Sequence, residues 1–537
     1  MSQGYLAKDY PITPTGVRFE TEDGGLRTMF DACERQAGEN IRPFGDRRVM
    51  QEGAMYQGVW LETQPMGGAM YAGRDMEIAL NNQLIFMLYQ RRDGRLPGMI
   101  TCSMPWKGVM AHYDWMQGDF FTRSALRMAA FIGGDEGYLR RLYGCLRDFD
   151  EYLWKYRDSD GDGCLESWCV WDTGDDNCTR LLATGIHARD HGMWCGETAP
   201  VGRGAFPMES AEYMAYSFSH NEVLARLARI LGTGEEERFA RRAAAIREKV
   251  RAYLWDEARG AVYDRDCGNR MLYTLSLSNL KCMYHGLFSP EMAETFVRRH
   301  LMNPAEFFTP LPLPSIAAND PLYYVDEEHN NLSPEAAAVV HANLVGDSLA
   351  NSWSGPVEGL SVQRSLDALL RYGYHAEATE IGRRWIANLI RCGKYVQQYD
   401  PMTGAPCGGL EGYGPTVLSA LNYTAYLYGV DFVNGRLIWS AGAAGADSAY
   451  TQSLFGRDYT LRRQGGEAEL SIDGRICARC GCGVRLMTDR DGRVLSAVNM
   501  EPTAVRLSLT AAGETRETDL APNGVVRWDE GADWSDR

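Results

Sequence analysis

Between about residue 119 and residue 429, apolar positions recur with the period of an α-helix. In one segment the apolar stripe consists of Tyr138, Leu142, Leu146, Phe149 and Leu153. This three- to four-residue spacing places all five side chains on one face of a helix. The same spacing predicts helices within 76–90, 239–254, 366–370, 381–389 and 413–428. The central part of the chain is therefore predicted to be mainly α-helical.

Long loops rich in glycine and proline separate these helices, most clearly at 157–207 and 303–335. Long loops inside a compact helical domain are uncommon unless they carry function. Helix pairs that alternate with long loops predict an (α/α)₆ toroid whose loops gather around a mouth. We expect this toroid to span residues 66–432, with residues 1–65 forming loops and a few strands packed on it.

After residue 432 the hydrophobic period changes from that of a helix to that of a strand. Ala468, Leu470 and Ile472 alternate with polar residues, and the segment 505–510 repeats the pattern. A period of two indicates half-buried strands, and the turn sequence DRDG at 489–492 favours a hairpin. Residues 433–537 are therefore predicted to form a small C-terminal β-sandwich.

Composition and charge narrow the range of partners. The chain has 537 residues, more than a single ordinary core, and a formal net charge of −16. An acidic surface argues against nucleic acid and anionic membranes as partners, and no apolar run approaches the roughly 18 residues of a membrane helix. The first residues show no signal peptide, and the 14 cysteines are scattered. Reduced cysteines predict a cytoplasmic protein, and we expect no metal and no cofactor.

The connection 157–180 concentrates acidic residues. Asp158, Asp160 and Asp162, followed by Gly163, resemble the start of a calcium loop. The twelfth position of such a loop should be a bidentate glutamate, whereas Cys169 stands there. We therefore interpret 158–163 as a tight turn after a helix.

The end of the same connection has the residue types of a catalytic acid. A carboxyl group keeps its proton near neutral pH when apolar walls or a second carboxylate surround it. In this segment Trp171 offers a wall and Asp175 offers a like charge beside Asp176. On residue types alone, however, an acidic loop is more often solvated than catalytic.

The whole string DSDGDGCLESWCVWDTGDDNCTR resembles the general-acid loop of glycoside hydrolase family 63 and its relatives. Those relatives include the mannosylglycerate hydrolases and, more distantly, the trehalases. Their loop reads approximately D-x-D-G-D-G, then E/D-S-G-x-D-(N/D)-S-P-R. The resemblance implies that Asp176 is the general acid, that Asp172 occupies the first acidic position and that Arg180 closes the loop.

Six further segments resemble the same family in the same order. They begin at Tyr113 (YDWMQGDFF), Leu254 (LWDEARGAVYDRD), Phe307 (FFTPLPLPS), Ser352 (SWSGPVEGLS), Gln397 (QQYDPMTG) and Gly412 (GYGPTVLSAL). Each segment is weak evidence by itself. Together they cover residues 113–430 and imply the six-hairpin toroid of glycosidases, with a carbohydrate as substrate.

One departure from the family concerns the base that activates water. The family has glutamate in E-x-Y-D-P, and Gln397 stands at that position here. An amide cannot accept a proton at neutral pH. Two glutamates are candidates to replace it: Glu358, at the start of a predicted helix whose dipole favours an ionised carboxylate, and Glu411, before the last helix. The alternative for each is a helix-capping acid at the rim.

Other residues are candidates for substrate contact, and core packing is the alternative for the aromatic ones. They are Trp115, Gln117, Asp119, Trp171, Asp172, Asp175, Arg180, Glu209, Trp353, Gln397, Tyr399 and Tyr413.

Three functions remain open from the sequence. The first is an inverting glycosidase acting on an α-linked sugar. The second is an inverting phosphorylase or transferase, which would need no water-activating base and would use Arg180 or Lys394 near phosphate. The third is a sugar-binding toroid without catalysis.

Overall fold

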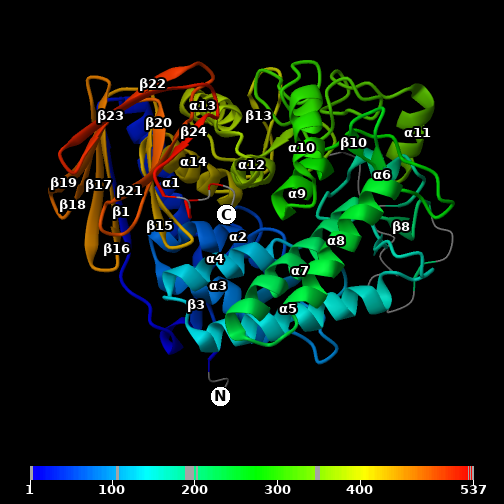
Figure 1. Ribbon diagram of the computed structural model, residues 1–537. Helices are drawn as coiled ribbons and strands as arrows, with labels where there is room; N and C mark the ends of the chain where they lie inside the picture. The colour runs from blue at the N-terminus through cyan, green and yellow to red at the C-terminus, as the bar shows by residue number, and fades with distance from the viewer. Residues whose placement is uncertain are drawn as a thin grey trace.

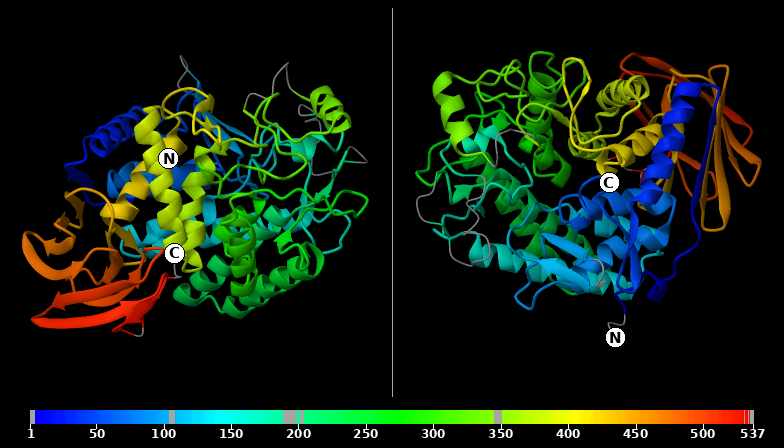
Figure 2. Two further views of the ribbon diagram at one scale, coloured as in Figure 1. Left: turned by 90° about the horizontal axis from the view of Figure 1, so that it is seen from above. Right: turned by 180° about the vertical axis from the view of Figure 1, so that it is seen from behind.

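The computed structural model describes residues 4–103, 108–187, 199–200, 204–344, 351–529, 531–532 and 534. Figure 1 shows a large helical part, coloured from blue to yellow, and a group of orange and red strands beside it. Both views in Figure 2 keep the strands on one side of the helices. This two-part arrangement agrees with the change of hydrophobic period after residue 432.

The predicted apolar stripes coincide with six helices, at 76–88, 136–156, 236–253, 359–371, 375–392 and 414–428. Asp135 caps one of them by accepting a hydrogen bond from the Tyr138 N–H, and Ser210 caps a further helix through Tyr213. The helices are η1 (Ala7–Asp9), α1 (Gly24–Glu39), α2 (Gln64–Met70), η2 (Tyr71–Gly73), α3 (Met76–Leu88), α4 (Phe121–Phe131), α5 (Glu136–Tyr156), α6 (Thr179–Leu182), α7 (Ala211–Leu231), α8 (Glu236–Tyr253), α9 (Ser278–His285), α10 (Pro290–Phe296), the π-helical turn η3 (Val297–Leu301), α11 (Pro334–Ala342), α12 (Gly359–Arg371), α13 (His375–Cys392) and α14 (Gly414–Tyr428).

Helices that follow one another in the chain pack as neighbours. Helix α7 packs against α5 and α8, and α12 packs against α9, α13 and α14. Helix α1 closes against α13 and α14, although it is far from them in sequence. The inward faces form one continuous core, and the rings of Trp168 and Trp385 are fully buried.

The C-terminal strands form two antiparallel sheets. One has five strands, in the order β14 (Val430–Val433), β15 (Arg436–Ala441), β20 (Val484–Thr488), β21 (Val494–Asn499) and β24 (Val525–Arg527). The other has seven, in the order β1 (Gly16–Thr21), β16 (Ser448–Leu454), β17 (Arg457–Gln464), β18 (Glu467–Ile472), β19 (Arg475–Gly481), β22 (Val505–Ala511) and β23 (Glu514–Leu520). The predicted hairpin at 489–492 joins β20 to β21.

The N-terminal segment does not lie on the helices alone. Strand β1 pairs antiparallel with β16, from Gly16 opposite Ser453 to Thr21 opposite Ser448. The start of the chain thus completes the sheet made by its end, a pairing between distant segments that the local pattern could not reveal. Helix α1, next in the chain, contradicts the expectation of only loops and strands in residues 1–65. Its buried residues Leu26, Met29, Phe30, Cys33 and Ala37 recur at helical spacing, and the helix packs on α13 and α14.

Short strands lie between the helices and carry several loop residues. They are β2 (Ile41–Phe44) with β3 (Arg47–Met50), β4 (Gly58–Trp60) with β5 (Met99–Ser103) and β6 (Gly108–His112), β7 (Glu166–Ser167) with β8 (Met208–Glu209), β9 (Trp255–Asp256) with β10 (Ala261–Val262), and β11 (Val357–Glu358) with β12 (Gln398–Tyr399) and β13 (Pro406–Gly408).

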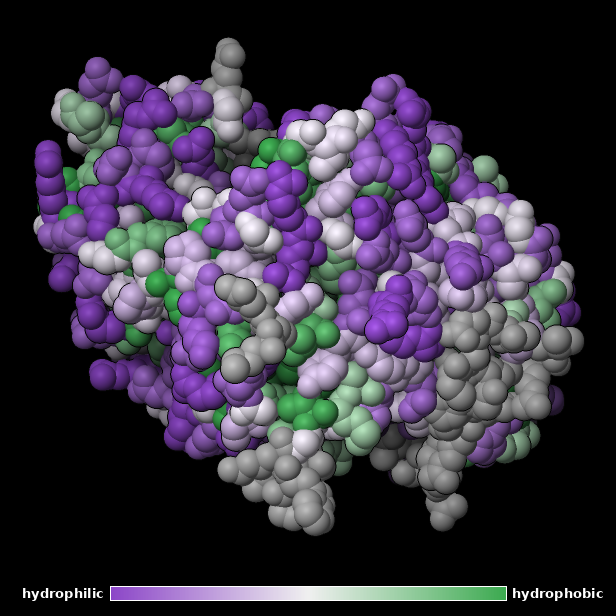
Figure 3. Space-filling view, turned by 90° about the horizontal axis from the view of Figure 1, so that it is seen from below, coloured by the Kyte–Doolittle hydropathy of each residue, from purple (hydrophilic) through white to green (hydrophobic). Residues whose placement is uncertain are grey.

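The surface is polar on the face that Figure 3 shows. Hydrophilic residues cover most of this face, and hydrophobic residues appear in small separate groups. Among the described helices, none has the length and apolar character that crossing a membrane requires. The cysteines in the described part of the chain are all free thiols.

Candidate functional site

Asp176 lies in the loop between β7 and α6, where neighbouring segments hold both its backbone and its carboxyl group. The Trp353 N–H donates to the Asp176 carbonyl at 3.0 Å, and Asn351 Nδ2 donates to Asp176 Oδ2 at 3.2 Å. Part of Asp176 is exposed. Loss of solvent around the carboxyl group, together with Glu62 and Asp175, raises its pKa to about 8. An accessible carboxyl group that keeps its proton at neutral pH has the properties of a general acid.

Glu62, which follows β4, places a second carboxyl group beside this loop. It accepts hydrogen bonds from Gln117 Nε2 at 3.1 Å and from Arg364 at 3.1 Å. Burial raises the pKa of Glu62 to about 7, although Arg364 opposes the shift. The close approach requires Gly174, because a Cβ atom there would lie 2.0 Å from Glu62 Oε2 and the backbone has φ +80°.

Glu52 brings a third acidic side chain into the same group. The pKa of this buried residue is raised well above its ordinary value by loss of solvent and by the charges of Glu62 and Asp176. The Tyr413 hydroxyl is bonded to it and acts in the opposite direction. The charges of Glu52, Glu62, Asp175 and Asp176 therefore influence one another.

Gln397 lies in a chain of hydrogen bonds that ends on Asp176. Tyr56 donates its hydroxyl proton to Gln397 Oε1 at 2.8 Å. Gln397 Nε2 then donates to Asn351 Oδ1 at 2.6 Å, and Asn351 donates to Asp176. The residue at the family's base position is thus connected to the candidate acid.

Glu358 is fully buried beside the same strand pair. Its Oε1 accepts from Gln398 Nε2 at 2.6 Å, and Oε2 has no hydrogen-bond partner among the described residues. Burial, and next the charge of Asp176, raise its pKa well above the ordinary range. The sequence predicts that the dipole of α12 keeps Glu358 ionised, whereas the direction of its pKa shift is the opposite. Glu358 is the N-cap residue, but its side chain accepts no bond from the helix N–H groups, so burial dominates.

Glu411 has a different environment. It is exposed, and its carboxylate accepts from Gln36 Nε2 at 3.0 Å and from the Tyr395 N–H at 3.2 Å. These contacts connect α1 to the segment after α13. Glu411 therefore does not cap α14, whose N-cap is Tyr413, and none of its contacts involves a residue bonded to Asp176.

Asp172 is buried and bonded to the protein itself, so it is not open to a substrate. Its fully buried carboxylate accepts from Arg157 at 2.6 Å, from the Trp168 N–H at 2.8 Å and from the Met116 N–H at 3.1 Å. Although burial opposes the shift, Arg157 lowers the pKa of Asp172. Breaking a buried pair of this kind costs about 3–5 kcal/mol. Asp172 therefore anchors the loop that bears Asp176.

Asp175 and Arg180 belong to a second buried ionic network. Lys281 Nζ contacts Asp175 at 2.5 Å and Glu212 at 3.0 Å, and it also donates to the Thr173 carbonyl at 3.1 Å. Arg180 pairs with Asp264 and lies 3.6 Å from Asp175. These ion pairs fix the position of the loop. They also occupy the Arg180 guanidinium with the carboxylates of Asp264 and Asp175.

The remaining candidates divide between open and buried surroundings. Trp115 and Trp171 are partly exposed and meet edge to face, with ring centroids 5.5 Å apart. Trp353 and Tyr413 are buried: Trp353 lies 5.8 Å from Lys281 Nζ, and Tyr413 packs against Tyr56 at 5.9 Å. These four rings lie on segments that contact the acid loop or its hydrogen-bond chain.

Tyr399 and Asp119 instead support the core. The fully buried Tyr399 packs edge to face on Trp385 at 5.3 Å and donates to the Lys394 carbonyl at 2.6 Å. Asp119, which is 1% exposed, accepts the Phe121 N–H at 2.9 Å and contacts His220 Nε2 at 2.6 Å. Both stacking by Tyr399 and direct sugar contact by Asp119 would require these buried contacts to open.

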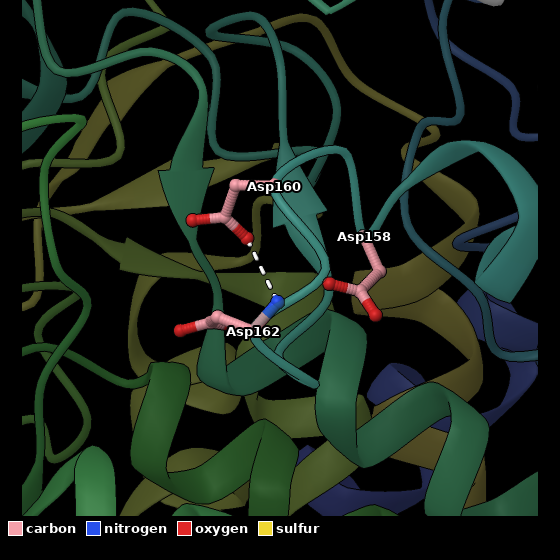
Figure 4. Close-up of side chains that lie close together, drawn as sticks. All are labelled: Asp158, Asp160 and Asp162. Carbon is pink, nitrogen blue, oxygen red and sulfur yellow. Dashed lines mark hydrogen bonds between the residues drawn. The ribbon is translucent and has the colours of Figure 1, made fainter.

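A group of carboxylates in the first part of the loop has the donor set of a cation site. Figure 4 shows Asp158, Asp160 and Asp162 around one turn, with the Asp162 N–H donating to Asp160 at 3.1 Å. Ligand atoms of these three lie within 4.8 Å of one another, as do those of Asp160, Glu166 and Glu209. The turn hydrogen bonds that we expected are present, including Gly163 N–H to Asp158 at 3.2 Å.

Glu209 links this acidic turn to β8 and indicates which ion would fit. It is 7% exposed, and its Oε2 has no hydrogen-bond partner in the described part of the chain. Burial and the charges of Asp162 and Glu166 raise its pKa to about 8. Carboxylate oxygens suit Ca²⁺, and Glu209 belongs to the group with Asp160 and Glu166 rather than to the group with Asp158 and Asp162. Its carboxyl group therefore belongs to the acidic turn and not to the surroundings of Asp176.

Calcium is expected to stabilise the wild-type protein but not a Glu209→Gln variant. An ion that binds only the folded state stabilises it by about 2.7 kcal/mol at about 100 times its Kd. Melting curves with Ca²⁺ and with EDTA measure this effect, and Glu248→Gln on the exposed face of α8 is the matched control. Tb³⁺ luminescence excited through Trp168, whose Nε1 donates to Glu166 at 2.7 Å, locates the ion. Equal melting temperatures with and without Ca²⁺ would contradict the site.

Several residues of this site carried no signal in the sequence. Glu52, Tyr56 and Glu62 lie in the N-terminal segment, which the local pattern describes only as loops and strands. Arg364 lies on the inward face of α12, where its period suggests an ordinary core position. Asn351 directly precedes a segment that resembles the family, and only its place in space reveals its contact with Asp176.

Comparisons with known proteins identify the family and the fold of the chain. Residues 67–415 match the model of the mannosylglycerate hydrolase MGH1-like glycoside hydrolase domain. The structure is similar to the family 63 mannosylglycerate hydrolase of Thermus thermophilus, solved in complex with glucose, with 17% identity, a TM-score of 0.57 and coverage of 74% of this chain and 99% of that chain.

Two other solved structures share the fold at lower identity. A sialidase has 12% identity and a TM-score of 0.63, with 88% of this chain and 41% of that chain covered. The neutral trehalase of Saccharomyces cerevisiae has 13% identity and a TM-score of 0.50, with 74% and 80% covered. No curated protein sequence matches the chain.

Proposed function

Since this chain belongs to the mannosylglycerate hydrolase MGH1-like glycoside hydrolases, we propose that it cleaves an α-linked glycoside with inversion and that Asp176 is the general acid. The observation that carries this proposal is the state of the Asp176 carboxyl group. It is partly exposed, it has a pKa of about 8, and among the described residues the one side-chain donor to it, Asn351, contacts Oδ2. Its proton is therefore available to a glycosidic oxygen at neutral pH.

Glu358 is the base that we propose in place of the family's glutamate. Its neighbour Gly359 donates its N–H to the Gln397 carbonyl at 2.9 Å, so Glu358 lies beside the position where the family has its base. Part of the rise in the pKa of Glu358 comes from the negative charge of Asp176. When Asp176 holds its proton, that repulsion disappears and Glu358 ionises more readily, which is the protonation state that the reaction needs.

The fold supports the same proposal. We propose that the helices of residues 66–432 close into an (α/α)₆ toroid and that residues 433–537, with β1, form the sandwich beside it. The partly exposed rings of Trp115 and Trp171 would then be offered to the apolar face of a sugar, whereas Trp353 and Tyr413 are buried and would support the site from behind. Gln117, which donates to Glu62 at 3.1 Å, would face hydroxyl groups at the same mouth.

Phosphorolysis has less support than hydrolysis. Arg180 is paired with Asp264 and lies near Asp175, so its charge is already balanced. Lys394 is exposed, and its carbonyl accepts the Tyr399 hydroxyl. Of these two candidate cations, neither lies free beside the acid, and hydrolysis is therefore the reaction that we propose.

A substrate screen tests the proposed function. α-Linked disaccharides and aryl glycosides are incubated with the wild-type protein, with and without phosphate, and NMR follows the anomer released first. We expect phosphate-independent release of the β-anomer. A sugar phosphate formed only with phosphate would establish phosphorolysis, and first release of the α-anomer would exclude inversion.

A further inference from the structure

Three side-chain hydrogen bonds that link Tyr56, Gln397, Asn351 and Asp176 run in one direction, while Gln397 also interacts with Glu358. The Tyr56 hydroxyl donates to Gln397 Oε1, Gln397 Nε2 donates to Asn351 Oδ1, and Asn351 Nδ2 donates to Asp176 Oδ2, at 2.8, 2.6 and 3.2 Å. Each amide thus accepts at its oxygen and donates at its nitrogen. The three side chains form a one-way relay of N–H and O–H groups that ends on the candidate acid.

The last bond of this relay distinguishes the two oxygens of Asp176. An amide nitrogen can donate a hydrogen bond but cannot accept one. The oxygen that receives the Asn351 N–H therefore cannot also direct a proton toward Asn351, and because an unprotonated carboxyl oxygen is the better acceptor, this bond favours the acidic proton on Oδ1. A general acid needs this selection, because only a correctly placed proton reaches the departing oxygen.

The environment of the relay fixes it in this orientation. Gln397 is 4% exposed, and its carbonyl is held by the Gly359 N–H at 2.9 Å, so the residue cannot easily turn away. Asn351 has φ +58°, a left-handed backbone that asparagine tolerates better than most residues. The Asn351 side chain is thus presented to Asp176 and Gln397 together.

We propose that Gln397 and Asn351 are positioning residues that fix the proton of Asp176 on Oδ1, so that the amide at position 397 orients the acid instead of activating water. The inference rests on the proposed function of Asp176 as the general acid. It explains why a glutamine is suited to this position: a glutamate there would have no N–H to give to Asn351.

The relay has a chemical consequence for Gln397→Glu. A carboxylate at 397 would attract Asn351 Nδ2 and turn the Asn351 oxygen toward Asp176. The Asp176 proton would then be donated to Asn351 and held away from the substrate. Gln397→Glu should therefore impair the acid, even though it restores the residue type of the family's base.

Leaving groups of different basicity separate this role from a structural one. A glycoside with a dinitrophenyl leaving group departs without protonation, whereas an alkyl or sugar leaving group requires the acid. For the sugar identified by the screen, kcat/KM is measured with both kinds of leaving group. The variants are Gln397→Glu and Asn351→Gly, which avoids left-handed strain. Gln464→Glu, at the exposed C-terminal end of β17, is the matched control.

We expect Gln397→Glu and Asn351→Gly to lower kcat/KM for the alkyl or sugar leaving group by about 10- to 100-fold, part of the factor of about 10²–10⁴ that general acids supply. The dinitrophenyl substrate should change by no more than about twofold. The basic limb of the pH profile should also move upward in Asn351→Gly, because the Asn351 bond lowers the pKa of Asp176.

Two results would overturn the positioning role. Faster hydrolysis by Gln397→Glu would show that position 397 acts on water, and equal losses for both leaving groups would show that the variants only disturb the structure. Failure of the proposed function looks different, because Asp176→Asn would then leave hydrolysis of both substrates unchanged. In that case the relay has no acid to orient, and both ideas are wrong.

Discussion

Asp176→Asn is expected to lower kcat/KM for alkyl or sugar leaving groups by about 10²–10⁴-fold, the range that a general acid contributes. The amide keeps the size of the side chain but has no acidic proton to deliver. A dinitrophenyl leaving group should recover most of the lost rate. Steady-state kinetics on the glycosides identified by the screen measure both effects, with Asp491→Asn in the exposed turn before β21 as the matched control.

The pH profile tests the same assignment independently. Because Asp176 must be protonated to act and its pKa is about 8, wild-type kcat/KM should fall as the pH rises above about 8. Asp176→Asn should lose this basic limb, because the titrating group has gone. A basic limb that persists in the variant would assign the titration to another group, such as Glu62 with its pKa of about 7.

Six of the helices could be predicted from the sequence because each of them has a local signal. The stripe from Tyr138 to Leu153 requires one buried face, and Asp135 supplies the cap that begins α5. The loop bearing Asp176 could be found because its residues are contiguous. The pairing of β1 with β16 had no such signal, since a strand reveals its own period but not its partner.

The rest of the site depends on distant segments that meet only in the folded chain. Glu52 and Glu62 lie far from Asp176 in the sequence, and the residues that flank them show no motif of a catalytic site. Glu358 and Glu411 look alike in the sequence, since each lies at the start of a helix. The fold separates them: Glu358 is fully buried, whereas Glu411 is exposed and held by Gln36.

Burial also explains why the pKa of Glu358 shifts in the direction opposite to the one expected from the helix dipole. A helix dipole stabilises a nearby carboxylate by about 0.3–1 kcal/mol at the surface. Removing a carboxylate from water costs several kcal/mol, so burial decides the balance. A sequence shows that a helix begins at Glu358 but does not show how much water remains there.

Glu358→Gln is expected to lower kcat/KM by about 10²–10⁴-fold for both kinds of leaving group, because water must be activated whichever group departs. This equal loss contrasts with Asp176→Asn, whose defect depends on the leaving group. The replacement is nearly isosteric, and its amide oxygen can still accept from Gln398 Nε2, which now donates at 2.6 Å. Kinetics with the dinitrophenyl and alkyl glycosides measure the loss.

Glu411→Gln makes the same chemical change at the other candidate and is therefore the decisive control. Its exposed carboxylate only joins Gln36 to the Tyr395 N–H, so we expect near wild-type kinetics. If Glu411→Gln removes activity and Glu358→Gln does not, the base is Glu411. If neither variant changes hydrolysis of the dinitrophenyl glycoside, water is activated by another carboxylate, and Glu52 and Glu62 are the buried acids that already interact with Asp176.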